Sequence, residues 1–329
     1  MHRLNINIVV GVLAFVVIMT GAFHGLAAEK SITVGNKNFT EQYLIGQMIK
    51  QLLENRGFKV DLRADLTSMA LRAGMESGDI DICADYTGTA WMVYLKRKYE
   101  PGVSHDALHE AVKKEDMQNG LMWLSPIWNN NTYALASWLE FAGKHRLKSL
   151  TDLARYYRHK DGRVETFVNF EFSARPDGLA ALQLFYDFKI ARPSLKTGTP
   201  GASLIALKTH QTQVAMVFGT DASIAKYGWH MYSDDKSFFP PYDLTPCVRK
   251  EILSTHPEIG DILNALVATF PGAGKEATPH MISECRNIWQ DLNARVDIDK
   301  MEPREVAHEY LRRHSLMKNG KPQCSKGIR

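Results

Sequence analysis

Ser31-Ile-Thr-Val-Gly-Asn-Lys-Asn-Phe-Thr-Glu41 is the stretch that decides the fold of this chain. Its first four residues, Ser31 to Val34, have the composition of a short strand. A helix is predicted after them, because Leu44, Met48 and Leu52 recur at helical spacing. A strand that runs into a helix is the first unit of an α/β fold.

The same alternation continues along the chain. Asn38 and Glu41 have the spacing of a capping box, which predicts where the first helix begins. Residues 58–62 alternate as a strand should, residues 68–77 are predicted to be helical, and residues 80–84 are predicted to be the next strand. Strand, helix, strand, helix, strand predicts a parallel sheet with right-handed crossovers.

Parallel sheets bind ligands beyond the carboxyl ends of their strands. Two segments of this chain lie there, Gly35–Glu41 after the first strand and Asp85-Tyr-Thr-Gly-Thr89 after the third. We therefore expect functional residues in these loops and not in the helices.

The middle of the chain starts a second α/β unit. Strands are predicted at 167–172 and 214–218, and a helix is predicted at 179–188. Segments near 129–132 and 238–243 are expected to join this unit to the first one. The fold class predicted from these patterns is α/β, with two α/β lobes and a ligand cleft between them.

The N-terminus has the pattern of a signal peptide. Arg3 precedes an apolar run at 8–20, and small residues follow it, so that the signal peptide, residues 1–28, is expected to be removed by cleavage after Ala27 or Ala28. An uncleaved membrane anchor is the alternative. No cysteine lies at the expected cleavage point, which argues against a lipid anchor. The mature chain is expected outside the cytoplasm, in the periplasm.

Composition excludes several function classes. The chain has 329 residues, 45% of them hydrophobic and 23% charged, which is ordinary for a globular protein. Its net charge of +4 is too small to indicate nucleic-acid binding. Cys83, Cys247, Cys285 and Cys324 form no C-x-x-C pair, so neither a zinc ribbon nor a thioredoxin-like centre is predicted. Disulfides remain open, and Cys285 with Cys324 is the preferred pairing because it would tether the C-terminal tail.

Catalytic patterns are weak. His105 and His109 have the four-residue spacing of a metal pair, but aspartate stands at 106 where the zinc-protease pattern needs glutamate. A solvated helix face is the favoured interpretation of this pair. The chain has no G-x-S-x-G elbow, no P-loop and no dinucleotide-binding glycine pattern. No enzyme activity, cofactor or metal is predicted.

Aromatic residues in loops are more informative. Tyr86, Tyr133 and Tyr242 each lie next to a strand end or a lobe crossing. A single tyrosine in such a place is usually a core residue. Several converging on one cleft would attract a quaternary ammonium ion, which cannot donate hydrogen bonds but is held by ring quadrupoles.

Five motifs together resemble one family, the glycine betaine/carnitine/choline-binding proteins of osmoprotectant ABC importers. The similarity runs from about residue 31 to 317. The motifs that carry it are Gly35-Asn-Lys-Asn-Phe-Thr-Glu-Gln42, Asp85-Tyr-Thr-Gly-Thr89, Arg175-Pro-Asp-Gly178, Asp234-Asp-Lys-Ser-Phe-Phe-Pro-Pro-Tyr242 and Leu292-Asn-Ala-Arg-Val-Asp297.

The resemblance implies a type II periplasmic binding-protein fold. One lobe would be discontinuous, formed by residues 29–130 and 241–329, and the other would contain residues 131–240. Tyr86 and Tyr242 would be cage walls from the first lobe, and Tyr133 a wall from the second. Phe218 stands where the family often has tyrosine; it keeps a π face but lacks the hydroxyl, and plain strand core is its alternative reading.

The resemblance also implies donors for the carboxylate of a betaine. Lys37 would meet it near a helix N-terminus, Thr89 from the neighbouring loop and Arg175 from the opposite lobe. The alternatives are a solvated Lys37, a capping Thr89 and an Arg175 engaged in a surface ion pair.

The expected function is capture without reaction. The protein would bind a quaternary-ammonium compound, glycine betaine or a related betaine, and deliver it as a monomer to the membrane permease of an ABC importer. Choline, carnitine and ergothioneine are alternative ligands for the same cage. A catalytic or sensory protein on the same fold is the remote alternative.

Overall fold

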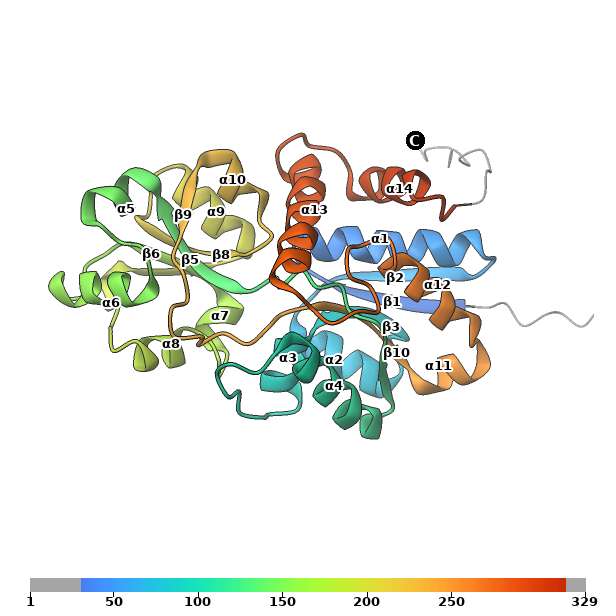
Figure 1. The fold of residues 1–329 in the computed structure, drawn as a ribbon. Helices are drawn as coiled ribbons and strands as arrows, with labels where there is room; N and C mark the ends of the chain where they lie inside the picture. Colours follow the sequence, from blue (N-terminus) through green and yellow to red (C-terminus); the bar gives the residue numbers. More distant parts are fainter. Residues whose placement is uncertain (1–30, 318–329) are drawn as a thin grey trace, which may run out of the picture. The chain divides into compact units, whose positions relative to one another are not determined.

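The structure is a computed structural model that describes residues 31–317 (Figure 1). The predicted signal peptide, residues 1–28, and Cys324 lie outside the described residues. Among residues 31–317, no helix has the length and apolar character needed to cross a membrane.

The first lobe is built on a mixed sheet. Its strands are β1 (Ser31–Lys37), β2 (Lys59–Leu66), β3 (Ile82–Tyr86), β4 (Leu121–Trp123) and β10 (Leu244–Arg249). Their order is β2-β1-β3-β10-β4. β1 pairs in parallel with β2 and β3, which confirms the parallel arrangement predicted for this part of the chain. β10 returns from far along the sequence and lies antiparallel between β3 and β4.

Helices cover both faces of this sheet (Figure 1). One face is covered by α1 (Thr40–Asn55), which packs on β1 and β2 and is itself contacted by α12 (Glu258–Val267), α13 (Pro279–Asp297) and α14 (Pro303–Arg313). The other face is contacted by α2 (Ser68–Ser77) and α4 (His105–Asp116). The remaining helical segments here are α3 (Thr87–Thr89), a π-helical turn (Ala90–Tyr94), a 3-10 turn (Met117–Asn119) and α11 (Lys250–Thr255).

The second lobe repeats this plan. Its sheet contains β5 (Tyr133–Trp138), β6 (Thr166–Asn169), β7 (Leu195–Gly198), β8 (Val214–Phe218) and β9 (Trp229–Met231), in the order β7-β6-β8-β5-β9. Its helices are α5 (Leu139–His145), α6 (Leu150–His159), α7 (Phe170–Ala174), α8 (Leu179–Phe185), α9 (Pro200–Lys208) and α10 (Ala222–Tyr227), with a 3-10 turn at Arg192–Ser194. β8 is buried at every residue, as its unbroken apolar run indicates.

Two segments carry the chain between the sheets, and they are hydrogen-bonded to each other. The amide of Asn131 donates to the carbonyl of Tyr242 at 2.8 Å. In return, the Asn130 side chain accepts from the amide of Tyr242 at 3.0 Å, and the Asn129 side chain accepts from the amide of Leu244 at 3.0 Å. Both crossings therefore hold the start of β10 close to the start of β5.

Two local predictions are wrong. The residue before α1 is Phe39, and no side chain caps that helix end, so Asn38 and Glu41 do not form a capping box. The strand predicted at 167–172 ends at Asn169, because the Asn169 side chain accepts from the amide of Phe172 at 2.6 Å and starts α7.

Candidate functional site

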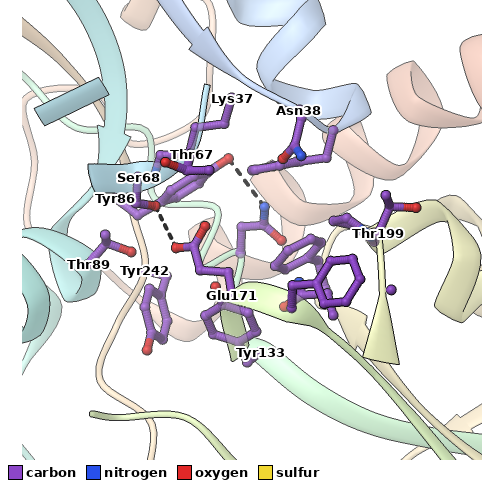
Figure 2. Close-up of a pocket in the computed structure, with 17 residues that line it drawn as sticks. Lys37, Asn38, Thr67, Ser68, Tyr86, Thr89, Tyr133, Glu171, Thr199 and Tyr242 are labelled. Carbon is purple, nitrogen blue, oxygen red and sulfur yellow. Dashed lines mark hydrogen bonds between the residues drawn. The ribbon is translucent and has the colours of Figure 1, made fainter. Parts of the chain in front are cut away.

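A cavity of about 140 Å³ lies between the two lobes (Figure 2). It meets the carboxyl ends of β1, β3, β6, β7 and β8, which is where α/β sheets place their ligands. Both loops singled out in the sequence contribute to its wall. The lining residues are Lys37, Asn38, Phe39, Thr67, Ser68, Tyr86, Thr89, Asn131, Tyr133, Asn169, Phe170, Glu171, Gly198, Thr199, Pro200, Phe218 and Tyr242.

The predicted aromatic residues converge on this cavity. Tyr133 lies at the centre of the group, with its ring centroid 5.6 Å from that of Tyr242 and 5.2 Å from that of Phe218. The Tyr133 and Tyr242 rings are almost perpendicular, at 86°. Tyr86 lines the cavity from the end of β3, in the first lobe. The four side chains that the sequence nominated therefore border one space, and Phe218, at the end of its strand, belongs both to the cavity wall and to the hydrophobic core.

Phe39 is a further aromatic wall that the sequence did not nominate. Its ring stacks on Phe218, with centroids 4.9 Å apart, and lies 6.1 Å from the Tyr86 centroid. It belongs to the loop between β1 and α1, so it brings a first-lobe ring against a second-lobe ring. Its position inside the Gly35–Gln42 motif was the signal that could have identified it.

The Asp85–Thr89 loop is fastened to the segment that carries Tyr242. The Thr87 hydroxyl donates to the carbonyl of Pro241 at 2.9 Å and accepts from the amide of Asp243 at 3.1 Å. A Cβ on Gly88 would lie 2.8 Å from both the Pro241 carbonyl oxygen and the Tyr242 ring. Glycine is therefore required at this position for Tyr242 to pack where it does.

Polar partners fix the orientation of the Tyr86 ring. Its hydroxyl donates to Glu41 at 2.8 Å and accepts from the side-chain amides of Gln42 at 3.2 Å and Asn131 at 3.3 Å. The same Glu41 oxygen accepts from Asn129 at 3.1 Å and from Asn131 at 3.1 Å. Burial raises the pKa of Glu41 to about 7, against the hydrogen bonds that lower it. The Glu41 carboxyl group thus links Tyr86, in the cavity wall, to the segment at Asn129–Asn131 that connects the two lobes.

The three tyrosines are neutral at physiological pH. Burial raises the pKa of Tyr86, Tyr133 and Tyr242 above the usual value of a phenol. They present electron-rich ring faces, which attract a quaternary ammonium group.

Lys37 lines the cavity but is not solvated. Its side chain is 4% exposed, and its Nζ lies 2.5 Å from Oδ1 of Asp85. Asp85 is held in turn by the amide of Tyr86 at 2.7 Å and the hydroxyl of Tyr94 at 2.7 Å. The Lys37 Nζ also lies 5.2 Å from the centroid of the Tyr86 ring. The solvated alternative for Lys37 is therefore wrong, and the side chain is a paired cation next to an aromatic wall.

Arg175 lies directly behind the lining residues. Its guanidinium donates to both oxygens of Asp177, at 2.8 and 2.6 Å. Its third nitrogen, Nη1, donates to the Thr89 hydroxyl of the first lobe at 3.1 Å. The guanidinium carbon lies 5.1 Å from the Tyr133 centroid. Arg175 is buried, so the surface ion pair considered as its alternative is wrong.

Glu171 is a charged cavity residue that the sequence missed. Figure 2 shows it between Tyr86 and Tyr133, with its carboxylate directed toward the first lobe. It accepts from the Ser68 hydroxyl at 2.6 Å and from Arg175 Nη1 at 3.2 Å. Burial opposes ionisation of this carboxyl, but the charges of Lys37 and Arg175 outweigh burial and lower its pKa. Glu171 was not predicted as a site residue, because it lies within residues 167–172, which were predicted to form a strand.

The histidine pair serves the first lobe and not a metal. His109 is buried and in hydrogen-bond contact with the Leu124 carbonyl at 2.8 Å, and His105 Nδ1 lies 2.6 Å from Asp243. The solvated helix face expected here is therefore wrong. Among residues 31–317, no group of three histidine, cysteine, aspartate or glutamate side chains is placed to hold a metal ion.

The architecture and the motifs agree with a known family. A family model described as the substrate-binding domain of ABC-type glycine betaine transport systems matches residues 30–313. The chain belongs to this family. Because the family is the substrate-binding domain of ABC-type glycine betaine transport systems, the chain is a transport protein.

Relatives of this chain are named for glycine betaine or for ergothioneine. The glycine-betaine-binding protein of Pseudomonas aeruginosa is 33% identical over 303 residues, which cover 90% of this chain and 92% of the relative. The glycine betaine-binding protein YehZ of Escherichia coli is 29% identical over 300 residues, covering 89% and 93% of the two chains. The ergothioneine transport permease/ergothioneine binding protein EgtU of Helicobacter pylori is 30% identical over 290 residues, which cover 88% of this chain and 48% of that protein.

Solved structures confirm the two-lobe binding-protein fold. The crystal structure of a glycine betaine/carnitine/choline ABC transporter protein aligns with a TM-score of 0.66 at 24% identity, covering 87% of this chain and all 100% of the other. Apo YehZ from Escherichia coli aligns with a TM-score of 0.57 at 29% identity, covering 87% and 99% of the two chains.

Proposed function

We propose that this protein captures glycine betaine or a related betaine in the cavity between its lobes and releases it to the permease of an ABC importer. The observation that supports the proposal best is the convergence of six aromatic side chains on one cavity. They are Phe39, Tyr86, Tyr133, Phe170, Phe218 and Tyr242. Each face contributes roughly 0.5–2 kcal/mol to holding a desolvated cation, so several together give useful affinity.

The carboxylate of the betaine would lie toward the paired cations. Lys37 and Arg175 are both buried beside the aromatic walls, and the Thr89 hydroxyl, which accepts from Arg175, would be a neutral donor. Asp85 and Asp177 already balance the two cations. We propose that the ligand carboxylate shares these donors and does not replace their carboxylate partners.

Closure of the lobes would complete the cage. The first lobe contributes Tyr86 and Tyr242, and the second contributes Tyr133 and Arg175. Contacts between the lobes include the Ser68–Glu171 and Thr89–Arg175 hydrogen bonds. A ligand stabilises this closed arrangement only by its higher affinity for it. The proposed lobe boundaries are 29–130 with 241–329, and 131–240.

Export and the absence of catalysis belong to the same proposal. Residues 1–28 would act as a signal peptide, and the mature monomer would work in the periplasm without cofactor or reaction. Choline, carnitine and ergothioneine are the alternative ligands, because Phe218 presents a π face without the hydroxyl that a tyrosine would offer.

Calorimetric titration of the mature protein with glycine betaine, choline, carnitine and ergothioneine tests the proposal. We expect saturable heat with at least one of them. Tyr86→Ala should weaken the best ligand about 10-fold or more, since it removes one face worth roughly 1–2 kcal/mol. Tyr156→Ala, in α6 and outside the cavity wall, is the matched control and should bind like the wild type.

The outcomes separate two claims. No heat with any methylated ammonium compound would contradict the proposed function. Unchanged affinity in Tyr86→Ala, with wild-type binding intact, would contradict only the assignment of that wall.

A further inference from the structure

Two cysteines that are far apart in the sequence lie opposite each other in the first sheet. Cys83 is in the middle of β3, Cys247 is in β10, and the antiparallel register pairs them directly. Directly opposed residues project their side chains from the same face of a sheet. The two thiols therefore share one environment, although nothing in the sequence placed them together.

That environment is dry and well packed. Cys83 is 3% exposed and Cys247 is 1% exposed. Both belong to the apolar cluster under α2 and α4, together with Leu71, Val112 and Trp123. Burial, and after it the neighbouring Cys83 thiol, raises the pKa of Cys247 well above the usual value of a thiol.

The spacing of an antiparallel pair suits a disulfide. Opposed residues have Cα atoms about 4.5 Å or about 5.5 Å apart, depending on whether the pair exchanges backbone hydrogen bonds. Disulfides span Cα separations of roughly 4.4–6.8 Å. The disulfide can therefore form here by rotation of the two side chains, without movement of either strand.

We propose that Cys83 and Cys247 are a disulfide-forming pair that is oxidised in the exported protein. The inference rests on the proposed export, because disulfides persist in oxidising compartments. In the reaction, the Sγ–Sγ bond forms while a protein or small-molecule disulfide oxidant is cleaved to two thiols. The two protons and two electrons of the cysteines pass to that oxidant, so the exchange balances.

The bond forms before the cluster closes around it. Thiolate is the attacking species in disulfide exchange, and burial suppresses thiolate once the sheet has folded. The described part of the chain offers no competing pair, since the third cysteine, Cys285, lies on α13 and donates to the Pro271 carbonyl at 3.3 Å.

The cross-link would act on the cavity walls. Along the same two strands, Thr245 pairs with Asp85 and Leu244 pairs with Tyr86. Tyr242 lies two residues before β10. A covalent bond between β3 and β10 therefore fixes the register of two segments that each end in a wall of the cage, and it removes conformational freedom from the unfolded chain.

Peptide mapping of the mature protein isolated from the periplasm tests the inference. Free thiols are alkylated in denaturant, the chain is digested without reduction, and cysteine peptides are identified by mass spectrometry. We expect the Cys83 peptide linked to the Cys247 peptide, and separation of the two on reduction. Alkylated, unlinked peptides of both residues would overturn the inference, as would a bond from either residue to another cysteine.

Refolding of the mature chain separates this test from the proposed function. With oxidised glutathione as the disulfide donor, the Cys83–Cys247 link should form in vitro, whereas the folded reduced protein should react many-fold more slowly. Reductant should lower the melting temperature of wild type and of the control Cys285→Ser, but not that of Cys83→Ser/Cys247→Ser. An equal response of all three proteins would count against the bond. None of these measurements depends on ligand binding. They would therefore still test the disulfide if the proposed binding function were wrong.

Discussion

Gly88 is the residue whose missing side chain lets Tyr242 reach the cavity. A Cβ here would lie 2.8 Å from the Tyr242 ring and from the Pro241 carbonyl oxygen, closer than real Cβ atoms approach. Because the Pro241 contact is with backbone, the clash cannot be relieved by turning a side chain. Close packing makes such local misfits expensive.

We predict that Gly88→Ala weakens ligand binding at least 10-fold and lowers the melting temperature, since overpacking typically costs about 1–3 kcal/mol. Gly143→Ala is the matched control. Gly143 lies in α5, and a Cβ there would meet nothing within 4 Å. Alanine at 143 should leave affinity unchanged and raise helix stability slightly. Calorimetric titration and thermal unfolding measure both effects; wild-type affinity in Gly88→Ala would show that Tyr242 is not constrained as described.

The carboxylates of the site illustrate what a sequence shows for single residues. Glu171 and Asp177 both bind Arg175, yet neither was nominated, because a charged residue in an apolar run or a turn is usually on the surface. Tyr86, Tyr133 and Tyr242 were identified because each lies next to a strand end or a lobe crossing, and the family resemblance added Phe218. What the sequence cannot supply is the pairing of each cation with its buried carboxylate, since that depends on contacts between segments from different lobes.

At the scale of elements, prediction succeeded where periodicity is unbroken. The helix at 68–77 and the buried strand at 214–218 were located to the residue. Prediction failed where a local hydrogen bond overrides an apolar run, as at Asn169, which ends β6 and caps α7. The antiparallel insertion of β10 was also beyond reach, because pairing between distant strands leaves no local pattern.

The contact between α2 and α7 joins the lobes at the edge of the cavity. Ser68 is the first residue of α2, and its hydroxyl donates to Glu171 in α7 at 2.6 Å. Since the two helices belong to different lobes, this bond stabilises the closed arrangement over any arrangement in which they separate. A hydrogen bond to a charged acceptor contributes about 1.5–3 kcal/mol, of which solvation in the separated state recovers part.

Ser68→Ala should therefore weaken affinity about 5-fold, on the order of 1 kcal/mol, by favouring the separated arrangement. Ser77→Ala is the control at the other end of the same helix. The Ser77 hydroxyl hydrogen-bonds to Gly74 and Asp79, which both belong to its own lobe. Titration of both variants with the best ligand checks the prediction. Equal losses in the two variants would mean that α2 stability, and not closure, sets the effect.

At the scale of the whole molecule, ionisable groups are concentrated where the lobes meet. Glu41 in α1 and Asp221 at the start of α10 belong to different lobes but influence each other electrostatically. Burial raises the pKa of Asp221 to about 8, while the amide of Phe218 donates to it at 2.7 Å. The negative charge of Asp297, at the end of α13, raises the pKa of Asp221 further. Burial raises the pKa of Asp297 as well. Where the two lobes meet, the surroundings of Glu41, Asp221 and Asp297 thus favour the protonated form of each carboxyl group.

This arrangement gives stability a definite dependence on pH. The pKa of Glu41 is raised from 4.5 to about 7 on folding, so the folded state holds its proton more tightly than the unfolded chain does. Its contribution is fully present below pH 4.5 and is lost as pH rises to about 7. The difference corresponds to on the order of 3 kcal/mol. Carboxyls whose pKa is lowered, such as Glu171, act in the opposite direction, so the wild-type curve alone does not isolate Glu41.

Comparison with Glu41→Gln removes that ambiguity. Glutamine can still accept the bond from Tyr86 but does not titrate, so the variant loses no Glu41 contribution between pH 5 and 8. We predict that the unfolding free energy of Glu41→Gln, relative to wild type, rises from pH 5 to about pH 7 and then levels off, as measured by urea unfolding at unit pH intervals. Asp221→Asn should show the same rise extended to higher pH, because the pKa of Asp221 is about 8. A difference that stays constant with pH in both variants would mean that neither carboxyl is protonated at the junction, and that the cavity wall at Tyr86 rests on a permanent buried charge.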